Sequence, residues 1–75
     1  MVKRRGTVDK VTLVRQIYKD LDQCELTIGF DTYTAFYPYS ELEGFQGKEV
    51  SFVLRPDLVN GLEVLVITEI TLMSV

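Results

Sequence analysis

The sequence predicts an all-β protein, a small five-stranded barrel with one short helical turn between its third and fourth strands. Asn60-Gly61 lies between two apolar, β-rich runs. This pair is a strong hairpin signal because a two-residue type I′ turn needs positive φ at both central positions. Residues 24 to 30 alternate between two faces, which is the period of a half-buried strand. Val, Thr, Ile and Tyr, which favour sheets, are frequent in residues 2 to 18.

The period of residues 2 to 18 fits either a helix or a strand. Val11, Val14 and Ile17 share a helical stripe, whereas Val11, Leu13 and Ile17 share a strand face. Composition favours the strand, because no good helix cap precedes the run and Gly6 is typical of a bend or bulge in a long strand. We therefore expect a long, bent first strand over residues 2 to 18, followed by a turn over residues 19 to 23.

The second strand is expected over residues 24 to 30. The residues on its apolar face are Cys24, Leu26, Ile28 and Phe30. Asp31-Thr32 predicts a tight return into a third strand over residues 33 to 37. Pro38 ends that strand, because proline has no N–H to donate to a sheet ladder.

A short helix is expected after Pro38. Residues 40 to 43 match a capping box, in which the Ser40 side chain caps a backbone N–H and the Glu43 side chain reaches back. The pattern predicts one helical turn that ends near Gly44.

The last hairpin, over residues 47 to 72, contains a conflict of register. Counting back from a two-residue turn pairs Phe52 with Glu69 and Leu54 with Ile67, which leaves one face of the sheet mixed. One extra residue in one arm removes the conflict, and Arg55-Pro56 is the expected place because proline in sheets is confined to edges, strand starts and bulges. In the alternative interpretation strand four stops at Arg55 and residues 58 to 61 form an ordinary loop.

Length and composition predict one domain over residues 1–75, near the lower size limit for a single core, so that association with a partner is plausible. No apolar run approaches the roughly 20 residues that span a bilayer, and the N-terminus is polar. We expect a soluble, cytoplasmic protein with no membrane contact. Cys24 is the only cysteine and falls on an apolar strand face, which predicts a buried structural thiol.

The sequence argues against catalysis. It has no histidine, no glycine-rich phosphate loop and no serine-based motif, so acid-base and nucleophilic chemistry would depend on carboxylates alone. No cluster of ligands has a recognised metal-binding spacing. We therefore expect a protein that is not an enzyme and that uses no cofactor and no metal.

The order of the segments resembles the OB-fold, a five-stranded Greek-key barrel. The resemblance is carried by the glycine-containing first strand, the short helix, and the GKEV segment that opens strand four before the Asn-Gly turn. Residues 42 to 72 are similar to the end of single-strand-binding proteins and related OB modules. An SH3-like barrel has similar spacing and is the second expectation.

The resemblance implies ligand binding on strands two and three and on the loops beside them, where nucleic-acid-binding members combine a basic groove with stacking aromatic residues. In this chain Asp20, Asp22, Glu25 and Asp57 fall in those places, and carboxylates repel phosphate. Charge is also divided along the chain. Six bases and one acid up to residue 19 give +5, and the remaining two bases and ten acids give −8.

The aromatic cluster between residues 30 and 39 predicts a non-catalytic binding module. Strand alternation cannot bury all five of its rings, and exposed tyrosines are enriched at interfaces. We expect a protein partner or a second copy to dock on a tyrosine-rich face formed by Tyr33, Tyr37 and Tyr39. A simpler interpretation places Phe30 and Phe36 in the core and treats the tyrosines as half-buried cover.

Binding of single-stranded DNA or RNA is the alternative function. In that hypothesis the basic N-terminal strand contacts phosphates while the tyrosines stack on bases. The basic residues concerned are Lys3, Arg4, Arg5, Lys10 and Arg15.

Overall fold

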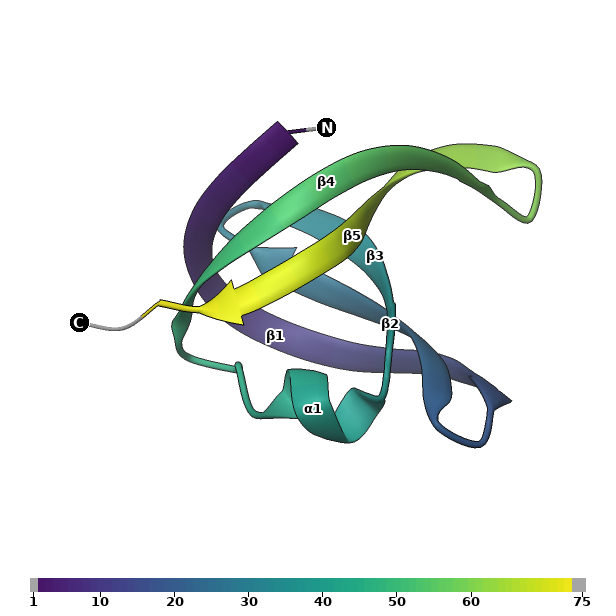
Figure 1. Cartoon of the computed structure of the whole chain (residues 1–75), viewed down its shortest axis with the longest axis horizontal. Coiled ribbons are helices and arrows are strands. Elements are labelled where there is room, and N and C mark those ends of the chain that lie inside the picture. The colour runs from purple at the N-terminus through teal and green to yellow at the C-terminus, as the bar shows by residue number, and fades with distance from the viewer. Residues whose placement is uncertain (1, 74–75) are drawn as a thin grey trace.

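The computed structural model describes residues 2–73, which form a closed five-stranded barrel (Figure 1). The elements in chain order are β1 (Val2–Tyr18), β2 (Leu21–Ile28), β3 (Asp31–Tyr37), α1 (Tyr39–Glu43), β4 (Glu49–Val59) and β5 (Leu62–Leu72). The order around the barrel is β1-β2-β3-β5-β4, and β4 closes it against β1. The predicted all-β barrel with a short helix between strands three and four is confirmed, and its architecture is compatible with an OB-like small barrel.

Strand β1 is as long as predicted, and it pairs with two neighbours. Residues 2–7 pair with β4, and residues 8–18 pair with β2. Gly6 lies just before this change of partner, and a Cβ there would come within 2.7 Å of Ile28 Cγ2. Glycine is required because β1 approaches the side chain of Ile28 more closely than any Cβ permits.

The Asn-Gly hairpin forms as predicted. Asn60 and Gly61 have φ values of 54° and 80°, and Val59 pairs with Leu62 across the turn. Strand β4 continues to Val59, so the alternative interpretation, in which strand four stops at Arg55 and residues 58 to 61 form an ordinary loop, is wrong. A bulge does correct the register, but the extra residue is Thr68 in β5, because Val53 pairs with Glu69 and Leu54 with Ile67.

The β2–β3 turn lies two residues earlier than the expected turn at Asp31-Thr32. Ile28 pairs with Asp31, so Gly29 and Phe30 form the turn, with Gly29 at a φ of 67°. Phe30 therefore does not belong to the core: its relative exposure is 105%. Similarly, β2 begins at Leu21, which shortens the expected turn over residues 19 to 23.

Helix α1 is held by a residue outside it. Its N-cap position is Pro38, with no side-chain cap, and the Tyr39 N–H donates to Asp22 Oδ2 at 2.8 Å. The expected capping by Ser40 is wrong, because the carboxylate on β2 takes that role. Gly44 ends the helix as predicted.

The core lies between the inner faces of the five strands, with Leu42 of α1 fully buried against it. Strand alternation supplies the rest of the core, and Cys24 is part of it, as the sequence predicted. The other members are Val8, Val11, Leu26, Ile28, Tyr33, Ala35, Val50, Phe52, Leu54 and Ile67. Within residues 2–73 there is no helix with the length and apolar character needed to cross a membrane.

Candidate functional site

The three tyrosines of the predicted docking face lie on the inner side of the barrel wall or on α1. Tyr33 is only 6% exposed, and Tyr37 and Tyr39 are half-buried and packed against the core. The face of β3 that points outward carries Thr34 and Phe36 instead, and Phe36 is half-buried. The expectation of an exposed Tyr33 is therefore wrong, because β3 turns its tyrosine face inward.

Tyr37 has a structural contact that accounts for its position. Its hydroxyl donates to the carbonyl oxygen of Thr68 at 2.7 Å, which ties the end of β3 to the bulge in β5. Burial raises the pKa of the Tyr37 phenol, and the negative charges of Glu69 and Glu41 raise it further. The side chain therefore stays neutral and remains a hydrogen-bond donor well above physiological pH.

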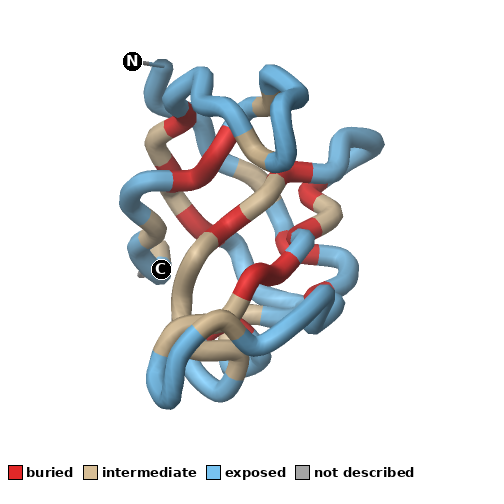
Figure 2. The backbone as a smooth tube through the Cα atoms, turned by 90° about the vertical axis from the view of Figure 1, so that its right-hand side faces the viewer, coloured by how far each residue is buried: buried red, intermediate tan, exposed pale blue. Residues whose placement is uncertain are grey.

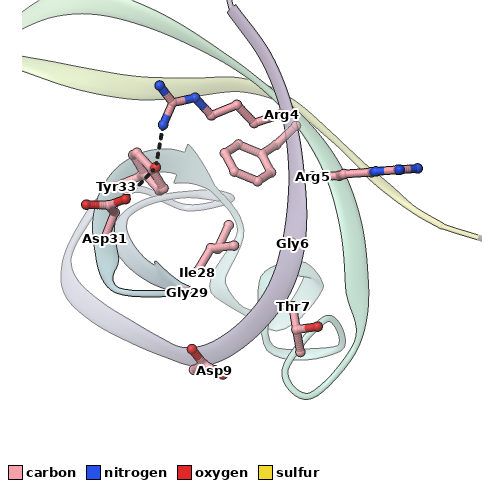
Figure 3. A pocket seen from close by; sticks show the side chains of 10 residues that line it. Arg4, Arg5, Gly6, Thr7, Asp9, Ile28, Gly29, Asp31 and Tyr33 are labelled. Carbon is pink, nitrogen blue, oxygen red and sulfur yellow. Dashed lines mark hydrogen bonds between the residues drawn. The ribbon is translucent and has the colours of Figure 1, made fainter.

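Tyr33 links the core to a cleft at the surface (Figure 3). Its ring packs against Phe52 with centroids 5.4 Å apart, and its hydroxyl donates to Asp31 Oδ2 at 3.4 Å. The Arg4 guanidinium donates to the same hydroxyl, also at 3.4 Å. Of the predicted nucleic-acid residues, Arg4 is thus brought together with a tyrosine.

The cleft has a volume of about 400 Å³. Its lining residues are Arg4, Arg5, Gly6, Thr7, Asp9, Ile28, Gly29, Asp31, Tyr33 and Phe52. The Arg4 side chain extends over the cleft, whereas those of Arg5 and Thr7 point away from it (Figure 3). Its floor consists of residues that are at most 6% exposed, such as Tyr33 and Phe52, and its rim carries both signs of charge. The rings of Tyr33 and Phe52 are therefore too deeply buried for a nucleic-acid base to stack on them.

The predicted basic residues divide among three surfaces. Lys3 and Arg5 share the outer face of the β1–β4 sheet, and Arg4 between them points to the barrel mouth. Lys10 and Arg15 lie farther along β1, where it pairs with β2. These five cations therefore form no continuous track for a phosphate backbone.

Acidic and polar side chains accompany the basic ones. Lys3 shares a groove of about 350 Å³ with Glu69, and the Arg15 Nε–H donates to Gln23 Oε1 at 2.9 Å. Glu25 lies two residues from Gln23 on the same outer face of β2. The neighbours of Lys3 and Arg15 thus weaken the attraction of these cations for phosphate.

Most of the large exposed apolar residues lie on two hairpin arms, which sequence reasoning missed. The β1–β2 arm (residues 13–21) and the β4–β5 arm (residues 56–65) project from the same side of the barrel (Figure 1). Six of the nine large apolar residues exposed in residues 2–73 lie on them, and we call these six the arm residues. They are Leu13, Val14, Tyr18, Leu58, Leu62 and Leu65. A view of this side shows exposed chain above and below a buried and half-buried band (Figure 2).

The β4–β5 arm has a two-stranded backbone, so its side chains have no barrel interior to enter. The β1–β2 arm is two-stranded only at its tip, because Asp22, Gln23 and Cys24 also pair with β3. Leu58 and Leu62 are each 69% exposed and Tyr18 is 71% exposed. The signal in the sequence was the pair of consecutive apolar residues on each side of Asn60-Gly61, Leu58-Val59 and Val64-Leu65, which supplies apolar side chains to both faces of the β4–β5 arm.

Cys24 has the properties of a structural thiol. It is fully buried, and its Sγ lies 3.8 Å from the carbonyl oxygen of Tyr37, to which it can donate. Burial raises the pKa of the Cys24 thiol, and the nearby Asp22 carboxylate raises it further. The thiolate, which is the reactive form, is therefore disfavoured at this position.

Comparison with models of protein families, with curated proteins and with solved structures found no significant match to this chain.

Proposed function

We propose that this protein is a non-catalytic binding module that docks another protein through the two hairpin arms. The observation that carries the proposal is the clustering of the six arm residues on hairpins that leave the same side of the barrel. Exposed apolar surface gathered on one side of a soluble protein favours an interaction site there, because water contact with such surface is unfavourable. Tyr18 at the end of the β1–β2 arm is the kind of residue that anchors interfaces.

This proposal moves the docking surface from the tyrosine-rich face to the arms. Tyr33, Tyr37 and Tyr39 have a structural role in this proposal. Tyr33 is part of the core, Tyr37 and Tyr39 pack against it, and Tyr37 bonds β3 to β5. An OB-type barrel and a cytoplasmic location are further parts of the proposal. The OB resemblance supports it in one respect: the loops joining strands one-two and four-five, which form the arms here, flank the ligand face of that fold.

A protein partner ranks above nucleic acid because of charge. The division of the cations among three surfaces, each with acidic or polar neighbours, opposes the continuous positive groove that single strands require. The arms themselves mix Arg15 and Lys19 with Asp20, Asp57 and Glu63. Such a mixed rim around apolar residues is typical of protein interfaces.

The test compares three forms of the protein as baits in a cell extract. Leu58→Ser/Leu62→Ser removes apolar surface from one arm, and Phe30→Ser removes an even more exposed apolar residue that lies on neither arm. We expect partner proteins to be retained by the wild type and by Phe30→Ser at physiological salt, and to be lost from the arm variant. Equal retention by all three forms would contradict docking through the arms.

Fluorescence anisotropy with labelled single-stranded DNA and RNA tests the alternative function. We expect flat titrations at low salt and at about 0.15 M salt, where the Debye length is about 8 Å. Tight binding that falls steeply with salt and is lost in Lys10→Ala/Arg15→Ala would favour nucleic acid over protein.

A further inference from the structure

The two strand edges of the β4–β5 arm differ in the hydrogen-bonding groups that they present. In an antiparallel ladder, successive residues point their N–H and C=O groups alternately toward the partner strand and away from it. Val59 and Leu62 flank the two-residue turn as a hydrogen-bonded pair, and the register runs from there to Leu54 and Ile67 without a shift. The next pair, Leu58 with Glu63, therefore points its N–H groups outward.

The outward edge of β4 is closed to another strand. Pro56 stands at one of its two outward positions on the arm and has no N–H. At the other, the Leu58 N–H already donates to the Asp57 side chain, with a distance of 2.8 Å to Oδ1. The hydrogen bond to Asp57 also shows, independently of the alternation argument, that the Leu58 N–H points away from β5. Proteins protect exposed edges by such means.

The outward edge of β5 on the arm is open. Alternation gives Glu63 and Leu65 the outward N–H groups on this strand. Strand β3 could cover that edge, but it pairs with β5 only at Val66 and Ile67. The part of β5 on the arm, up to Leu65, therefore lies outside the β3–β5 ladder. Its outward N–H groups are not paired with β3.

We propose that the β5 edge over residues 62–65 accepts an extended strand of a partner protein, one in which apolar residues alternate with lysine or arginine. This inference rests on the proposed function and specifies how the partner docks. Leu62 and Val64 share one face of the arm and favour apolar cross-strand neighbours. Glu63 lies on the opposite face and favours a cation there. The net charge of −3 supports a basic partner over a second copy.

The test uses a short synthetic peptide of alternating lysine and valine, titrated into the full chain and followed by amide NMR signals. We expect shift changes concentrated at residues 62–65 and slower hydrogen exchange of the Glu63 and Leu65 amides. Peptides of alternating glutamate and valine, or of lysine and serine, are expected to bind at least about tenfold more weakly, a difference of about 1.4 kcal/mol. Equal binding of all three peptides would overturn the proposal.

Proline at either member of one cross-strand pair gives a matched comparison. Glu63→Pro removes an outward donor from the open edge, whereas Leu58→Pro changes the edge that is already closed. We expect the peptide affinity to fall about tenfold or more in Glu63→Pro and to change by less than about twofold in Leu58→Pro. Glu63→Gln, which keeps the donor and removes the charge, is expected to lose about threefold.

Hydrogen exchange of the free wild-type protein tests the geometry without any variant. The Glu63 and Leu65 amides are expected to exchange much faster than those of Val59 and Val64. Protection of Glu63 in a protein that sediments as a dimer would assign the edge to a second copy, and protection in a monomer would mean a closed edge. Either result overturns the proposal. If Leu58→Ser/Leu62→Ser loses its partner protein while Glu63→Pro retains it, docking through the arms is supported and addition of a strand to the β5 edge is contradicted.

Discussion

Gly6 shows how a single residue permits β1 to serve two neighbours. The space beside its Cα is taken by the Ile28 side chain, which is 5% exposed and cannot move aside easily. Gly6→Ala is therefore expected to lower the free energy of unfolding by about 1–3 kcal/mol, as overpacking in a filled core does. Urea denaturation of the variant measures this loss.

Gly44→Ala is the control for Gly6→Ala. Its added Cβ would lie 3.4 Å from the Glu41 carbonyl oxygen, and its φ of −66° is open to any residue. We expect a change within about 0.5 kcal/mol. If the two alanine variants are equally stable, the close approach of β1 to Ile28 is not a constraint on the fold.

Tyr37 predicts a pH dependence of stability. Because its pKa is raised on folding, the folded state holds the phenol proton more tightly than the unfolded chain does. Its contribution is complete below the ordinary tyrosine pKa of 10.0 and is lost as pH rises through the raised value. Tyr37→Phe is expected to cost about 1 kcal/mol at neutral pH, because it removes the hydrogen bond to Thr68.

The pH dependence is measured by urea midpoints of both proteins at neutral pH and above pH 10.0. The difference between wild type and Tyr37→Phe should narrow at the alkaline end, since only the wild type can lose this phenol proton. Parallel pH profiles would show that Tyr37 titrates alike in the folded and unfolded states.

At the scale of elements, helix α1 depends on a residue 17 positions away in sequence. Asp22→Ala removes the acceptor of the Tyr39 N–H, and we expect a loss of about 0.5–2 kcal/mol, the usual cost of losing an N-terminal cap. Ser40→Ala is the matched control and should change the stability by less than about 0.5 kcal/mol. A larger loss of stability in Ser40→Ala than in Asp22→Ala would instead support the capping box that the sequence pattern indicated.

The elements also show which features local sequence can predict. The Asn60-Gly61 turn, the length of β1 and the stop at Gly44 depend on a few adjacent residues and were predictable. Gly29-Phe30 also carried a local signal, since glycine in the first central position fits a type II′ turn, but the apolar alternation continued through Phe30 and concealed it.

Other features depend on contacts between distant segments. At the bulge, the Thr68 carbonyl accepts from the Tyr37 hydroxyl, a contact between residues 31 positions apart, and the Thr68 hydroxyl lies 3.4 Å from the Val53 carbonyl oxygen. The arms were not predictable for the same reason. Their exposure depends on where β3 meets β5, and no local pattern specifies that pairing.

The barrel as a whole closes through a short seam between β3 and β5. Only Thr34 with Val66 and Ala35 with Ile67 pair there, whereas β4 and β5 pair along almost their whole length. Local opening requires the least free energy where few backbone bonds are broken. We therefore expect the seam to open before the other ladders. Native-state hydrogen exchange in low urea should give a lower opening free energy for amides in the β3–β5 ladder than for those in the β1–β2 ladder.

Tyr37→Phe tests whether its hydroxyl helps to hold this seam. The Tyr37–Thr68 bond crosses from β3 to β5 just beyond the two paired positions, so its loss removes a cross-seam contact without changing either ladder. We expect the opening free energy of the seam to fall by about 1 kcal/mol relative to that of the β1–β2 ladder. An equal fall in both ladders would mean that the barrel opens as one cooperative unit and that β3 and β5 separate only on global unfolding. A selective fall would identify the seam beside the arms as the part of the wall that moves most readily.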